Sequence, residues 1–126
     1  MRVTVVIGAL LLLAASIQAN SISDRAYQFA RAKTVFPQGC SGLVSQALGR
    51  AWEDANSLMG SSPKLLGSNG NYGNPGAGAV IGWKNGHVAI WVGRADCVIA
   101  DSPGPGKAAR CLSSYGAQQV YRSSRF

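Results

Sequence analysis

The stretch QGCSGLVSQALGRAW, residues 38–52, sets a cysteine at the start of a helical pattern. Apolar residues recur there at i, i+3 and i+4, which predicts a helix from about Ser41 to Asn56 with one buried face. The residues on that face are Leu43, Val44, Ala47, Leu48, Ala51 and Trp52. Cys40 would stand in the first turn, where free backbone N–H groups and the helix dipole stabilise a thiolate.

A shorter helix is expected upstream of this stretch. Ser23 is a suitable N-cap for a helix that reaches about Lys33. Pro37 then separates the two helices, because proline biases the preceding residue toward an extended conformation.

Four strands are expected in the second half of the chain, over residues 79–84, 87–92, 97–101 and 118–122. The first two are joined by Asn85-Gly86, the strongest short hairpin signal. Helices followed by an antiparallel meander predict an α+β fold, with the N-terminal helices packed on the sheet.

A stretch rich in glycine and asparagine, residues 60–78, precedes these strands and is expected to be a long loop. Loops of this length in a small domain are usually functional or mobile. Tyr72 is the aromatic residue of this loop, and it would either stack on a ligand or simply lie exposed.

The N-terminal segment has the layout of a secretory signal peptide. A positive start is followed by an apolar run from Val3 to Ala15 and by the small residue Ala19. The run is shorter than the roughly 20 residues that span a bilayer, so no membrane span is expected. We expect residues 1–19 to be a signal peptide cleaved after Ala19, with cleavage after Ser16 as second choice. One secreted, extracellular domain, 20–126, would remain.

The charge of the chain suits an anionic partner. The formal net charge is +7, and it falls to +6 when Arg2 is removed with the signal peptide. The basic residues are scattered, without a run and without the interleaved aromatic pattern of a nucleic-acid reader. We therefore expect no nucleic-acid partner, and we expect a monomer that meets an anionic surface.

Three cysteines follow the signal peptide, so an oxidising compartment leaves one of them unpaired. Cys97 and Cys111 flank a loop rich in proline and glycine, and Cys40 lies far from both. A Cys97–Cys111 disulfide with Cys40 free is the economical assignment, although the sequence allows the other two pairings.

Cys40 and His87 are the candidate catalytic pair. His87 is the only histidine of the chain, and it begins a strand directly after the Asn85-Gly86 turn. A thiol at a helix start and an imidazole at a strand start can form a nucleophile–base pair. A third residue to orient the histidine would come from the next strand, where Asp101 and Ser102 are available. The length of the intervening turn decides between them, and we choose Asp101.

Two blocks of sequence carry a resemblance to a known family. CSGLV at residues 40–44 and GHVAIWVG at residues 86–93 resemble the signature blocks of the NlpC/P60 cell-wall peptidases, which are papain-like cysteine amidases. The resemblance covers about Ser23 to Arg122. The compact size and the stretch between the blocks resemble the type VI secretion amidase effectors. The signal peptide and extra cysteine pair resemble their domesticated amidase effector relatives in ticks and mites.

The resemblance implies a papain-like NlpC/P60 fold in which Cys40 is the nucleophile and His87 the base. It also implies a peptidoglycan amidase with a role in antibacterial defence. The D-Ala–diaminopimelate cross-link is the favoured bond, and the D-Glu–diaminopimelate bond is the alternative. No metal or cofactor is expected, because one histidine and disulfide-prone cysteines make a poor zinc set. The chain departs from many members at Gly39, where they carry an acidic residue.

A second function class is also compatible with these features. The chain could be a non-catalytic secreted protein of the lectin-like or envelope-binding antimicrobial type that keeps the same fold. Labelling of Cys40 with a thiol reagent separates the two classes, because only an enzyme would lose its activity.

Overall fold

The computed structural model describes residues 21–126, so the expected signal peptide at 1–19 lies outside the described residues. A helix over residues 21–31 comes first. The elements that follow are α2 (Cys40–Ala47), α3 (Ala55–Met59), β1 (Lys64–Gly67), β2 (Val80–Trp83), β3 (His87–Arg94), β4 (Cys97–Asp101), β5 (Arg110–Leu112) and β6 (Val120–Arg122). The predicted α+β class is confirmed.

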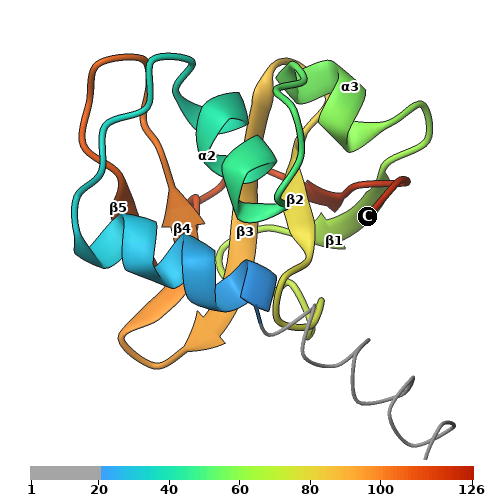
Figure 1. Cartoon of the computed structure of the whole chain (residues 1–126). Coiled ribbons are helices and arrows are strands. Elements are labelled where there is room, and N and C mark those ends of the chain that lie inside the picture. Colours follow the sequence, from blue (N-terminus) through green and yellow to red (C-terminus); the bar gives the residue numbers. More distant parts are fainter. Residues whose placement is uncertain (1–20) are drawn as a thin grey trace, which may run out of the picture.

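The strands form one antiparallel sheet in the order β1-β6-β2-β3-β4-β5. The helix over residues 21–31 and α2 lie on one face of this sheet (Figure 1). Strands β2 to β4 follow one another as the expected meander, β5 extends it, and β6 returns to pair with β2. Two strands were not expected, because β1 lies within the predicted loop over 60–78 and β5 has only three residues.

Apolar side chains fill both faces of the sheet. On the helix side, Val88 and Ile90 of β3 pack in one core cluster with Leu43 and Val44 of α2. On the opposite side, Ala89 of β3 belongs to a second cluster, which draws on four strands and the segment before β2. Its buried members are Tyr72, Ala79, Ile81, Ala89, Ile99 and Val120. β3 is therefore buried on both faces, as the run HVAIWV allows.

The single long helix predicted from Ser41 to Asn56 is wrong, since α2 ends at Ala47. Gly49 takes a left-handed conformation, with φ of 69°, which stops the helix. Asp54 then caps α3 by accepting a hydrogen bond from the Ser57 backbone N–H at 2.7 Å. As a consequence Trp52, which was expected in the buried stripe, is 54% exposed.

Two smaller expectations are also wrong. Ser23 lies inside the first helix and is buried, so it is not the N-cap. Tyr72 is only 2% exposed, because its ring packs edge-on against Trp91 in the second core cluster. Tyr72 is therefore neither exposed nor available to stack on a ligand.

Among residues 21–126, no helix has the length and apolar character needed to cross a membrane.

Candidate active site

Cys40 is the first residue of α2 and remains a free thiol. Gly39 caps the helix with φ of 67°, and its carbonyl accepts a hydrogen bond from the Leu43 N–H at 3.1 Å. A side chain at this position would collide with Pro105, because a Cβ atom built on Gly39 lies 2.8 Å from the Pro105 nitrogen. Glycine therefore lets the loop after β4 pack directly against the start of α2.

The register of β3 and β4 decides which residue meets His87. Ala100 pairs with Ile90, so Asp101 falls opposite Ala89. His87 is two residues from Ala89 and shares its face of the sheet. The His87 Nε2 and Asp101 Oδ1 atoms accordingly lie 2.7 Å apart.

With regular strands, the two-residue turn between β3 and β4 would have placed Ser102, rather than Asp101, opposite Ala89 and so on the face of His87. The turn occupies Ala95 and Asp96, with Arg94 paired to Cys97, and an irregularity between Trp91 and Arg94 then shifts the register. Ser102 is fully buried, and its hydroxyl lies 3.5 Å from the Gly104 carbonyl oxygen. The structure thus brings Asp101, and not Ser102, to the histidine.

Three side chains surround the buried carboxylate of Asp101. Oδ1 faces His87 Nε2 and also accepts a hydrogen bond from the Tyr115 hydroxyl at 2.5 Å. Oδ2 accepts a hydrogen bond from Arg110 Nε at 3.0 Å. Burial of the carboxyl group favours its neutral form, but the contacts with His87, Tyr115 and Arg110 outweigh it and lower the pKa of Asp101. The group is therefore an anion that can fix the imidazole.

Cys40 meets His87 at the start of β3, a central strand of the sheet. Successive N–H groups along a strand point to opposite neighbours. Because β4 ends at Asp101, the Val88 N–H is left facing the Cys40 sulfur. The Gly86 carbonyl oxygen lies 4.0 Å from the same sulfur. With Nε2 of His87 held by Asp101, Nδ1 is the ring nitrogen left to face the thiol.

The charges of this site favour a thiolate beside an imidazolium. Burial raises the pKa of the Cys40 thiol, but contacts with His87 and the Val88 N–H outweigh it and leave the pKa below its ordinary 9.0. Burial likewise lowers the pKa of His87, yet its hydrogen bonds to Asp101 and Cys40 raise that pKa from 6.5 to about 9. Each partner therefore stabilises the charged form of the other.

Aromatic rings enclose the imidazole. The Trp83 ring stacks on His87 with centroids 4.5 Å apart and planes 24° apart. The Tyr115 ring meets His87 edge-on at 5.5 Å and Trp83 edge-on at 4.9 Å. The backbone N–H of Tyr115 donates to the Tyr72 hydroxyl at 3.0 Å, which fixes the loop that carries Tyr115. Packing on two sides restricts the rotation of the imidazole.

The expected disulfide is present between Cys97 and Cys111. It joins β4 to β5, and each of its cysteines lies close in sequence to a residue of the site. Asp101 ends the strand that Cys97 begins, and Arg110 immediately precedes Cys111. The bridge therefore ties Asp101 and Arg110 to the same pair of strands.

Sequence reasoning missed three residues of this site: Trp83, Arg110 and Tyr115. Trp83 had only a partial signal, because a two-residue Asn85-Gly86 turn would pair Lys84 with His87. The loop instead holds three residues, Lys84 to Gly86, and so Trp83 pairs with His87. Arg110 and Tyr115 had none, because they lie on a three-residue strand and in the irregular segment after it.

Comparisons with known proteins do not identify a family, because no family model, no curated protein and no solved structure matches the chain. The chemistry of the site consequently rests on its own residues. A thiolate beside an imidazolium that a carboxylate orients can carry out nucleophilic attack on a carbonyl carbon, followed by proton transfer to the leaving group.

Proposed function

We propose that the chain is a secreted cysteine amidase of papain-like NlpC/P60 type that hydrolyses peptide bonds of bacterial peptidoglycan. The observation that carries the proposal is the alignment of Cys40, His87 and Asp101, with the His87–Asp101 contact at 2.7 Å. A structural cysteine and a structural histidine would not require a buried carboxylate on the far ring nitrogen. A polar group there serves a nucleophile and its base, because it holds the imidazole in one orientation and tautomer.

The reaction would begin when the Cys40 thiolate attacks the carbonyl carbon of the scissile amide. The backbone N–H of Cys40, at the start of α2, is placed to stabilise the oxyanion that forms. The His87 imidazolium then gives its proton to the leaving amine, and the C–N bond breaks. Water, deprotonated by His87, attacks the thioester carbon, and the product carboxylate and the Cys40 thiolate are released.

Peptidoglycan as the substrate rests on the resemblance of the CSGLV and GHVAIWVG blocks to cell-wall peptidases. The net charge, which is +6 once Arg2 is removed with the expected signal peptide, suits an anionic bacterial wall. The Cys97–Cys111 disulfide suits an extracellular protein, because such bridges persist in oxidising compartments. Within the stem peptides we favour the D-Ala–diaminopimelate cross-link.

Digestion of purified sacculi tests this function. Wild-type protein should release soluble muropeptides, and the masses of the products identify the bond that is cut. Cys40→Ala and His87→Ala should fold, as judged by circular dichroism, and release none. Peptide mapping without reductant should find Cys40 as the one alkylatable thiol. Full lysis by Cys40→Ala would refute the enzyme and leave an envelope-binding protein in its place.

A further inference from the structure

An exposed tryptophan is hydrogen-bonded to the residue that follows the candidate nucleophile. Trp52 is 54% exposed, and its indole Nε1 donates a hydrogen bond to the Ser41 hydroxyl at 2.9 Å. Ser41 adjoins Cys40 in the first turn of α2, and its hydroxyl also lies 3.2 Å from the Gln38 carbonyl oxygen. The largest exposed apolar side chain of residues 21–126 is thus anchored one residue from the reactive thiol.

The segment that carries Trp52 is fastened along its length to α2. After Gly49 reverses the chain, the segment runs back toward the start of the helix. The backbone N–H of Glu53 donates to the Ser45 hydroxyl at 3.2 Å, one helical turn beyond the Trp52–Ser41 contact. Ser45 is buried, so this hydrogen bond is shielded from competing water.

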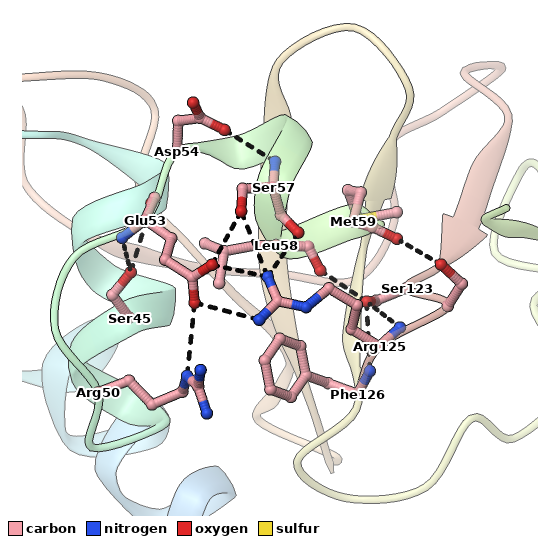
Figure 2. A network of polar contacts seen from close by, with 11 residues as sticks. Ser45, Arg50, Glu53, Asp54, Ser57, Leu58, Met59, Ser123, Arg125 and Phe126 are labelled. Carbon is pink, nitrogen blue, oxygen red and sulfur yellow. Dashed lines mark hydrogen bonds and ion pairs between the residues drawn. The ribbon is translucent and has the colours of Figure 1, made fainter. Parts of the chain in front are cut away.

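A cluster of charged side chains holds the same segment from the other side (Figure 2). Arg125 Nη1 lies 2.7 Å from Glu53 Oε1, and Arg50 Nε lies 3.4 Å from Glu53 Oε2. Hydrogen bonds from Arg125 and Ser57 lower the pKa of Glu53 to about 2, so the carboxylate stays charged. Both guanidinium groups also face the Phe126 ring, at 4.8 and 5.2 Å. The residues on each side of Trp52 are therefore fixed.

The chemistry that Trp52 can offer is limited by its anchor. Its only hydrogen-bond donor is already used on Ser41, so the exposed surface is the apolar, electron-rich face and edge of the ring. Such a surface suits the C–H groups on one face of a neutral, saturated ring better than it suits a carboxylate or an amide. A rigid aromatic side chain also loses little conformational entropy when it binds.

We propose that Trp52 is a sugar-binding residue, on which a ring of the peptidoglycan glycan strand stacks while the attached stem peptide enters the site at Cys40. This proposal rests on the proposed function, because the active site fixes which polymer lies beside the tryptophan. It assigns the α2–α3 segment to recognition of the glycan, and it leaves the choice of scissile bond to other residues.

Binding in a Cys40→Ala background tests the proposal without any need for hydrolysis. The probe is a neutral oligosaccharide of N-acetylglucosamine, one of the two sugars of the glycan strand, titrated by calorimetry. Adding Trp52→Ala should weaken binding about tenfold, which corresponds to ~1.4 kcal/mol. Trp52→Phe, which keeps an apolar ring face, should weaken binding less. Leu65→Ala is the matched control, since Leu65 is 50% exposed but lies on β1, three strands from β3.

A hydrolysis assay gives a second test of the role of Trp52. Trp52→Ala should lose more activity on intact sacculi than on soluble cross-linked peptides that carry no sugar. Equal oligosaccharide affinity in Cys40→Ala with and without Trp52 would overturn the proposal, as would equal losses on the two substrates. If the wild-type protein cuts neither substrate, the proposed function fails, and the binding arm still decides the role of Trp52.

Discussion

His87 and Asp101 meet diagonally across the β3–β4 pair, with Nε2 and Oδ1 2.7 Å apart. The direct partner of Asp101 is Ala89, a small residue that leaves room on this face for the carboxylate to reach along the strand. Tyr115 and Arg110 occupy the remaining positions around the carboxylate. The charge of Asp101 therefore orients His87, and this arrangement makes the pH dependence of the site predictable.

Asp101→Asn should lower turnover on the order of 10²-fold or more. The amide keeps the size of the carboxylate but removes the negative charge that helps to raise the pKa of His87 to about 9. In the wild type, the imidazolium persists at lower pH and is lost as the pH rises through about 9. The alkaline limb of kcat/KM should consequently move to lower pH in Asp101→Asn. A pH series of initial rates measures both effects.

Ser102→Ala is the control for this variant. The Ser102 hydroxyl lies 3.5 Å from the Gly104 carbonyl oxygen of its own loop, whereas the group that meets His87 Nε2 is the Asp101 carboxylate. We expect turnover close to that of the wild type. The reverse pattern, with a large loss in Ser102→Ala and little loss in Asp101→Asn, would transfer the orienting role to Ser102.

Tyr115→Phe should lower kcat by about tenfold, because a hydrogen bond to a charged group contributes ~1.5–3 kcal/mol. The Tyr115 hydroxyl is one of the donors that lower the pKa of Asp101. Its loss raises that pKa, so the acid limb of the pH profile should move to higher pH. Tyr121→Phe is the matched control, because its hydroxyl contacts Gln119 at the surface. If Tyr115→Phe lowers the melting temperature but leaves the pH profile unchanged, Tyr115 contributes to packing and does not act on Asp101.

The strands at the centre of the site could be predicted from the sequence. β4 has the expected bounds of Cys97–Asp101, and β3 begins at His87, directly after the expected turn, although that turn includes Lys84 as well as Asn85 and Gly86. The apolar spacing after Cys40 likewise predicted the start of α2 to within one residue, at about Ser41 where the helix begins at Cys40. These are local signals, in which a turn or a cap leaves few alternative conformations.

The rest depends on contacts between distant residues. The helical spacing continues through Trp52, but the left-handed Gly49 and the cap at Asp54 end one helix and begin another. Tyr115 follows Asp101 by 14 residues and carries no periodic pattern, so only the folded chain shows that the two side chains meet. The exposure of Trp52 could not be predicted for the same reason, since one long helix would have buried it.

Removal of the disulfide should affect both stability and activity. The bridge joins Cys97 to Cys111, which are 14 residues apart, and its loss from Cys97→Ser/Cys111→Ser should lower the free energy of unfolding by ~3 kcal/mol. Arg110 adjoins Cys111, so its contact with Asp101 should loosen as well. We expect a lower urea midpoint and, well below the melting temperature, a lower kcat. Activity unchanged in the fully folded variant would show that β5 holds Arg110 without the bridge.

Gly39→Ala should disturb the thiol more than it disturbs the fold as a whole. Gly39 and Gly73 share a φ of 67°, but a Cβ atom added to Gly73 would meet no other atom within 4 Å. Gly73→Ala therefore measures the conformational cost alone, about 1–2 kcal/mol. Gly39→Ala adds the contact of 2.8 Å with the Pro105 nitrogen, which must move the start of α2 or the loop after β4.

The difference between these two variants combines that contact with the backbone of Gly39, whose φ of 67° and ψ of −132° side chains rarely adopt. Gly39→Ala should unfold at lower urea than Gly73→Ala, and its Cys40 should react more slowly with iodoacetamide at neutral pH. A displaced sulfur loses the His87 and Val88 contacts that lower its pKa, so a smaller fraction is thiolate. Equal urea midpoints and equal alkylation rates in the two variants would contradict this prediction. They would show that the loop carrying Pro105 moves at no cost, and that glycine is needed at position 39 only for its backbone conformation.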